Sequence, residues 1–176
     1  GGADEDTEGG FEHGGWTMPY WDDKIGERLF EVIGQGESIL LGRKTWEIHA
    51  AAFEPMADDD PNEPGFNRMS KYVVSNTLTS ADAWRNSTII SGDVVGKIRE
   101  LKAQDGGDIL VDGSSELVHT LVENGLVDEI NLAVYPIVLG SGKKLFPDGT
   151  RINMRLADAT PVPSGVIMTR YMVDRG

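Results

Sequence analysis

The sequence predicts an α/β protein in which a mostly parallel sheet lies between two layers of helices. Short apolar runs alternate with helical patterns as far as residue 140, which is typical of crossover connections between parallel strands. Two further strand patterns, at 128–140 and 165–174, follow one another without a convincing helix between them. They predict an antiparallel C-terminal edge, so we expect a three-layer α/β/α sandwich with a mixed sheet.

The composition indicates a single globular domain over residues 1–176, with 39% apolar and 26% charged residues. No apolar run approaches the ~20 residues of a membrane-spanning helix. The net charge of −13 argues against binding to nucleic acid or anionic lipid, because Lys and Arg supply most of that affinity. Cysteine is absent, which excludes disulfides and Cys-ligated zinc and is compatible with the cytoplasm, where we expect the protein.

The first elements of the chain are a loop and a helix. Residues 1–15 are rich in glycine and acidic side chains and predict a flexible loop. A chain rarely begins inside a loop, so we expect native residues before Gly1. Apolar residues recur at helical spacing through 22–34, with Asp22 or Asp23 as an N-terminal cap and Gly34 as a stop.

Strands and helices then alternate along the chain. The acidic, proline-rich stretch 55–70 is interpreted as a surface loop, and 108–125 as a strand, a glycine turn and a helix. The other strands are expected at 38–42, 71–75 and 87–91, and the other helices at 43–50 and 93–104.

Two glycine turns follow apolar strands and open helices. In the first, Gly42 lets a ligand approach the backbone, Arg43 and Lys44 add positive charge, and Thr45 adds a hydroxyl group. These features suit a phosphate at a helix N-terminus. A strand end followed by two solvated cations is the alternative.

The second turn, residues 111–117, offers the N–H and hydroxyl groups of Gly113, Ser114 and Ser115. Helix capping by Ser114 is the alternative here. Ligands of open α/β sheets lie beyond the carboxyl ends of the strands, so both turns would face the same side. An extended dinucleotide could bridge them.

These stretches resemble a known family. "ILLGRKTWE" resembles the strand, turn and helix with which dihydrofolate reductases contact NADPH, and "YVVSN" is similar to their next strand. Residues 109–146, and "YPIVLGSGKKLF" above all, more closely resemble the reductase domain of bacterial bifunctional riboflavin-biosynthesis deaminase-reductases and its stand-alone relatives. The resemblance covers residues 16–173 and implies a dihydrofolate reductase-like fold.

The resemblance implies that the cofactor is NADPH. It places the first glycine turn at the phosphates and adenosine end, and Ser75 and Asn76 beside the adenosine 2′-phosphate. The second turn would lie against the pyrophosphate and its ribose. The implied cofactor-binding residues are Gly42, Arg43, Lys44, Thr45, Ser75, Asn76, Gly113, Ser114, Ser115 and Glu116.

Fewer residues of the sequence indicate where a substrate would bind. The family's first helix carries a carboxylate that binds the pterin, and Asp22 lies near the corresponding helix start, where it could equally be an N-cap. Trp16, Met18 and Trp21 could wall a flat heterocycle, or belong to the core or a dimer contact. The three histidines share no spacing, and we propose no metal site.

The resemblance implies an NADPH-dependent reductase of a small heterocycle, similar to 5-amino-6-(5-phosphoribosylamino)uracil reductase. A dihydropterin- or dihydrofolate-type reductase, a protein that binds NADP without turnover, and a phosphate-binding module without redox chemistry are the alternatives. The family's first strand has no counterpart in this sequence, and we expect it before Gly1. The zinc deaminases of the bifunctional relatives need Cys ligands, and this chain has no cysteine, so we do not expect it to deaminate in that way. Relatives are commonly homodimers built through the late strands, so we expect a homodimer.

Overall fold

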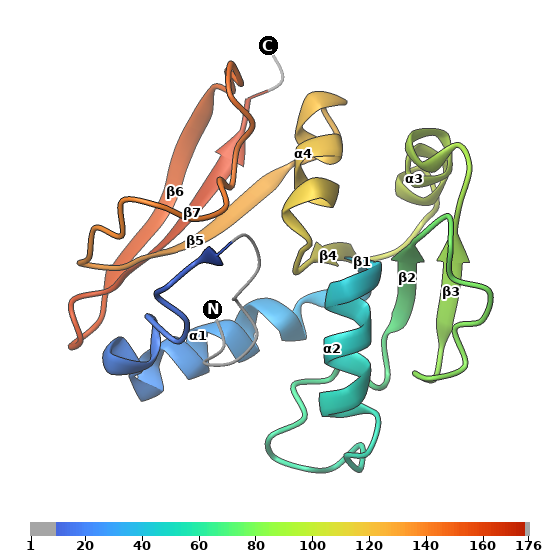
Figure 1. Cartoon of the computed structure of the whole chain (residues 1–176), viewed down its shortest axis with the longest axis horizontal. Coiled ribbons are helices and arrows are strands. Elements are labelled where there is room, and N and C mark those ends of the chain that lie inside the picture. The colour runs from blue at the N-terminus through green and yellow to red at the C-terminus, as the bar shows by residue number, and fades with distance from the viewer. Residues whose placement is uncertain (1–9, 175–176) are drawn as a thin grey trace. The chain divides into compact units, whose positions relative to one another are not determined.

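The computed structural model describes residues 10–174, which form two compact units (Figure 1). One unit comprises Phe30–Leu126 and Leu145–Pro147. The other comprises the described residues up to Leu29 together with Val127–Lys144 and those from Asp148 onward. The loop predicted at 1–15 lies largely outside the described residues.

A parallel sheet forms the centre of the unit around Phe30–Leu126. Its strands lie in the order β3-β2-β1-β4. Strand β1 is buried at every position from Ser38 to Gly42, and because successive side chains point to opposite faces, both faces of the sheet are covered. The strands are β1 (Gly36–Gly42), β2 (Ser70–Val74), β3 (Ser87–Ile90) and β4 (Asp108–Val111).

Three helices of this unit confirm the predicted alternation, with one exception. They are α2 (Arg43–Phe53), α3 (Val94–Lys102) and α4 (Ser115–Glu123). No helix connects β2 to β3 in this fully described part of the chain. The loop between them instead packs Leu78, Ala81 and Trp84 against the core, so it fills the space that a crossover helix would occupy.

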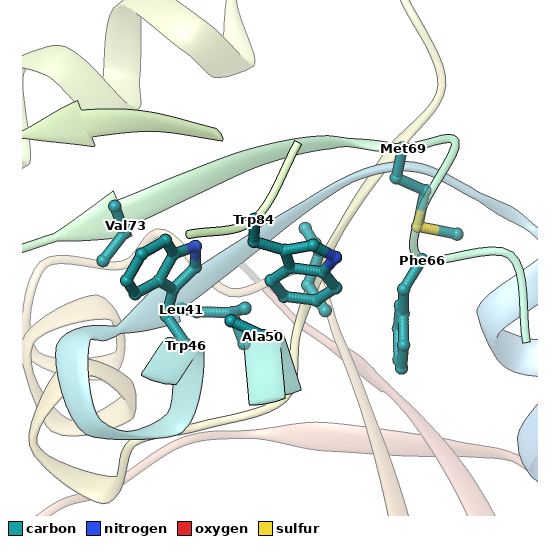
Figure 2. Close-up of a cluster of buried hydrophobic side chains, with 8 residues drawn as sticks. Leu41, Trp46, Ala50, Phe66, Met69, Val73 and Trp84 are labelled. Carbon is teal, nitrogen blue, oxygen red and sulfur yellow. The ribbon is translucent and has the colours of Figure 1, made fainter. Parts of the chain in front are cut away.

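The main core of this unit lies between α2, the sheet and the loops that flank β2 (Figure 2). Trp84 is fully buried and its indole nitrogen donates a 2.7 Å hydrogen bond to Asn67 Oδ1. The buried members of the cluster are Ile39, Leu41, Trp46, Ala50, Phe66, Met69, Val73 and Trp84.

A buried lysine lies at the amino end of β2. Lys71 is fully buried, and its ammonium group donates to the backbone carbonyls of Asn67 (3.1 Å) and Met69 (3.0 Å). The Nζ atom also lies 4.8 Å from the centre of the Trp84 ring. Burial lowers the pKa of Lys71 to about 8, because the charged form loses its hydration.

An antiparallel sheet forms the centre of the other unit. Strands β5 (Glu129–Val134), β6 (Met154–Pro161) and β7 (Ile167–Val173) lie in the order β5-β7-β6. The sequence did not predict β6, and β5 is shorter than the strand predicted at 128–140. Ile25 of α1 (Asp23–Gly34) packs with Val162, Val166 and Met168 in a smaller core.

The structure confirms the predicted α/β fold, with parallel strands first and antiparallel strands at the C-terminal end, but the strands form two separate sheets rather than the one mixed sheet that was predicted. The antiparallel part contains three strands rather than two because β6 pairs with β7 from Met154 to Pro161, with one register shift between Leu156 and Asp158. Within the described residues, no helix is both long enough and apolar enough to span a membrane.

Candidate functional site

The two glycine turns meet at the carboxyl ends of β1 and β4. The Gly42 amide donates a 3.1 Å hydrogen bond to the Gly113 carbonyl. A Cβ atom on Gly42 would lie 2.5 Å from Ser114 Oγ, and one on Gly113 would lie 3.1 Å from Thr45 Oγ1. Gly113 has a φ of +113°, which L side chains rarely adopt. The turns can therefore pack this closely only because both positions are glycine.

The helices that open from these turns lack side-chain caps. Gly42 is the N-cap of α2 and has no side chain to offer, and Ser114, the N-cap of α4, makes no capping hydrogen bond. The first N–H groups of both helices are thus without a cap from these residues, and carry the partial positive charge of a helix N-terminus. Capping by Ser114, the alternative that the sequence left open, is not seen.

Positive charge lies on the first turn of α2. Arg43 and Lys44 are exposed, and Arg43 Nη1 forms a 3.0 Å ion pair with Glu47. Trp46 fixes the helix below them, because its ring is buried and its Nε1 atom donates to Ser87 Oγ at 3.0 Å. The cations thus project from a rigid support.

Ser75 and Asn76 follow β2, the strand next to β1. The Ser75 hydroxyl accepts hydrogen bonds from the amides of Thr77 (3.2 Å) and Leu78 (3.0 Å). Asn76 Oδ1 accepts from the Gly92 amide at 3.0 Å, which ties the ends of β2 and β3 together. Both side chains therefore accept hydrogen bonds from backbone amides at this edge of the sheet. The Asn76 side chain is exposed there.

Ser115 and Glu116 form the first turn of α4. Ser115 is half-buried and Glu116 is exposed. The structure thus gathers residues from both predicted turns at one edge of the parallel sheet, where the carboxyl ends of its strands lie.

The predicted substrate residues lie in the other unit. Asp22 Oδ1 accepts a 2.8 Å hydrogen bond from the Lys24 amide and so caps α1. Trp16 packs edge-on against Tyr135, with ring centres 4.9 Å apart. Met18 and Trp21 are 60% and 55% exposed. Their roles toward a substrate stay predictions.

One polar contact of the site was not predicted. His49 Nε2 on α2 lies 2.9 Å from Asp112 Oδ2, in the turn that follows β4. The two residues are 63 positions apart, and the sequence shows only that Asp112 precedes the glycine turn. Across residues 10–174, no group of three or more His, Asp or Glu side chains is placed to hold a metal ion.

Comparison with known proteins assigns a family to this arrangement. The profile of the RibD C-terminal domain matches residues 9–168, nearly the whole chain. Protein YyaP of Bacillus subtilis (strain 168) is 31% identical over 145 residues, which cover 80% of this chain and 76% of that protein. The chain belongs to the RibD C-terminal domain family. The resemblance found in the sequence is thereby confirmed.

Solved structures show the fold of this family. A putative riboflavin biosynthesis protein from Shewanella sp. PV-4 superposes with a TM-score of 0.65 at 21% identity, covering 82% of this chain and 78% of its own. A diaminohydroxyphosphoribosylaminopyrimidine deaminase/5-amino-6-(5-phosphoribosylamino)uracil reductase from Thermotoga maritima gives 0.62 at 13% identity. That match covers 87% of this chain and 50% of the Thermotoga chain. At these identities the RibD-type fold is what the likeness shows.

Proposed function

We propose that this protein is an NADPH-dependent reductase that transfers hydride to a small heterocyclic substrate. The observation that carries the proposal is the junction of the two glycine turns, in which the Gly42 amide bonds the Gly113 carbonyl at 3.1 Å. Membership of the RibD C-terminal domain family and the reductase named among the solved structures support the same chemistry.

The junction fits a dinucleotide because it joins the N-termini of two helices that have no side-chain cap. Backbone N–H groups at such ends bind phosphate oxygens, and two ends side by side suit the two phosphates of a pyrophosphate. Side chains at Gly42 and Gly113 would occupy the space between the turns. Gly42, Thr45, Gly113, Ser114, Ser115 and Glu116 would hold the pyrophosphate and its ribose.

The exposed cations favour NADPH over NADH. Arg43 and Lys44 would attract the 2′-phosphate, which NADH lacks, and Ser75 and Asn76 lie on the neighbouring strand end. In a chain with a net charge of −13, a local pair of cations gives an anionic ligand a specific place to bind.

The nicotinamide supplies the hydride when it is bound, so the chain needs to bind, orient and exclude water rather than to form a catalytic triad. By the family resemblance, the substrate is a ribosylaminopyrimidine such as 5-amino-6-(5-phosphoribosylamino)uracil. Asp22 would bind the heterocycle, and Trp16, Met18 and Trp21 would contact its flat ring. Dihydropterins are the alternative substrates.

We also propose a homodimer formed through the antiparallel sheet. Apolar side chains on its strands are exposed, namely Val134 (49%), Leu156 (51%) and Ile167 (42%). Burying such side chains against a second copy would remove apolar area from water.

The test is calorimetric titration of the protein with NADPH and, separately, with NADH. We expect tighter binding of NADPH, and an affinity about tenfold lower in Arg43→Ala, because one charge-assisted contact contributes roughly 1.5 kcal/mol. Arg99→Ala, which removes an exposed arginine on α3, is the matched control and should bind like the wild type.

Turnover is then followed as loss of NADPH absorbance with ribosylaminopyrimidines and dihydropterins. Failure of the folded protein to bind either nucleotide would contradict the proposal. Equal affinities would contradict the preference for NADPH. Tight binding without oxidation of NADPH by any of these substrates would favour a protein that binds NADP without turnover.

A further inference from the structure

His49 and Asp112 link the two halves of the candidate site. His49 lies on α2, which opens from the first glycine turn, and Asp112 directly precedes Gly113 in the second turn. Their Nε2 and Oδ2 atoms are 2.9 Å apart, within hydrogen-bond distance. This side-chain contact joins α2 to the second turn, in addition to the backbone hydrogen bond from Gly42 to Gly113.

The histidine ring is held by its surroundings. Its centre lies 5.6 Å from that of Phe53, 5.5 Å from that of Phe66 and 6.2 Å from that of Trp84. Its Nδ1 atom is buried and has no hydrogen-bond partner within the part of the chain that the structure describes. A carboxylate only accepts, so Nε2 carries the proton and donates to Asp112. The aromatic packing thus aims one donor at one carboxylate.

The Asp112 carboxylate would weaken the binding of a phosphate group if no hydrogen bond held it in place. Its side chain is 62% exposed, and its neighbour Gly113 forms the junction at which the proposed pyrophosphate would bind. A carboxylate that turned toward phosphate groups would repel them, and repulsion between such charges at a few ångströms amounts to kilocalories per mole.

We infer that His49 is a positioning residue that holds the Asp112 carboxylate against α2 and away from a bound pyrophosphate. The inference rests on the proposed binding of NADPH and adds a residue that acts on it without contacting the nucleotide. His49 does so through one hydrogen bond, while its packing against the three rings fixes the direction of that bond.

The test is a double-mutant cycle on nucleotide affinity with His49→Phe and Asp112→Asn. Phenylalanine keeps an aromatic ring among Phe53, Phe66 and Trp84 and removes both ring nitrogens, of which only Nε2 contacts Asp112. The unfolding temperature should therefore stay close to that of the wild type. We expect His49→Phe to weaken NADPH binding about fivefold, since an unpaired carboxylate then faces the phosphates. The double variant should recover the affinity of Asp112→Asn, which itself binds at least as tightly as the wild type.

Two controls test whether the effect of His49→Phe depends on Asp112 and on the pyrophosphate. Asp105→Asn removes an exposed carboxylate elsewhere and should not rescue His49→Phe. Adenosine 2′-phosphate, a probe without a pyrophosphate, should bind the wild type and His49→Phe alike.

Each other outcome has a separate meaning. If the wild type binds NADPH and His49→Phe binds it with the same affinity, the inference is overturned while the proposed function stands. A loss that persists in the double variant, or one that extends equally to adenosine 2′-phosphate, would also overturn the inference, because either would indicate a purely structural role. A wild type that binds no dinucleotide would overturn the proposed function, and the inference with it.

Discussion

The two sheets of this protein differ in how deeply their strands are buried. In the parallel sheet, Ile39, Leu40 and Leu41 are consecutive and at most 1% exposed. In the antiparallel sheet, all but one residue of β6 is exposed. Parallel strands joined by crossovers need cover on both faces, whereas antiparallel strands tolerate water on one.

The difference extends to the predicted sites. The parallel sheet brings its strand ends to one edge, so turns that are distant in sequence meet there, as Gly42 and Gly113 do. The antiparallel unit imposes no such convergence, and Met18 and Trp21 lie exposed near the start of α1. Topology therefore supports the cofactor residues more directly than the substrate residues.

The same substitution in the two sheets should give the largest contrast in stability. Leu41 is fully buried and Leu156 is 51% exposed. We expect Leu41→Ala to lower the free energy of unfolding by about 2–5 kcal/mol, through lost burial and a cavity, and Leu156→Ala by less than about 0.5 kcal/mol. Urea denaturation at low protein concentration measures both.

A loss of similar size in Leu156→Ala would contradict the contrast. If that loss also grew with protein concentration, the exposed face would be covered by a second copy, as the proposed homodimer requires. Unequal m-values would indicate a change in the surface exposed on unfolding rather than in packing alone.

The contrast also explains what the sequence could predict of the fold. Strand β1 was predictable because burial on both faces requires an uninterrupted apolar run, which residues 39–41 supply. Strand β6 was not, because its side chains are mostly exposed and its sequence carries Asp158 and Pro161. Backbone pairing with β7 holds β6 in place. Such pairing does not require a pattern of apolar residues in the sequence.

The site shows the same division. The glycine turns were predictable because the topology of a parallel sheet places all its carboxyl ends at one edge. The contact between His49 and Asp112 was not, because it depends on how α2 is rotated by the packing of Trp46 and Ala50 against the sheet. Residue type reports a capacity for hydrogen bonding, and only tertiary packing selects the partner.

Lys71 in one unit and the half-buried Tyr135 in the other should make stability depend on pH in opposite directions. The pKa of Lys71 falls from 10.5 to about 8 in the folded protein, so between these values the unfolded chain holds a proton that the folded chain has lost. Stability therefore rises with pH in this window. We expect a gain of about 2 kcal/mol from pH 8 to 10 relative to Lys71→Met, which cannot titrate.

Tyr135 acts in the reverse direction. Burial raises its pKa above 10.0, so above pH 10 the unfolded chain loses a proton that the folded chain keeps, and stability falls. Tyr135→Phe should lack this fall. Thermal unfolding of the three proteins across pH 7–11 measures both effects, and parallel curves for the wild type and Lys71→Met would contradict the assignment to Lys71.

The smallest expected change in stability compares the two helices that have side-chain caps, α1 and α3. Asp22 caps α1, and Asp93 Oδ1 caps α3 by accepting from the Gly96 amide at 2.9 Å. Replacing either by alanine should lower the free energy of unfolding by about 1 kcal/mol, whereas asparagine keeps the acceptor and lowers it by a few tenths of that.

Turnover distinguishes the two residues, because a carboxylate that binds the substrate needs its charge and an N-cap does not. We expect Asp22→Asn to keep its stability and lose turnover, and Asp93→Asn to keep both. Full turnover in Asp22→Asn would restrict Asp22 to capping, and the carboxylate that binds the heterocycle would then have to be sought elsewhere in the chain.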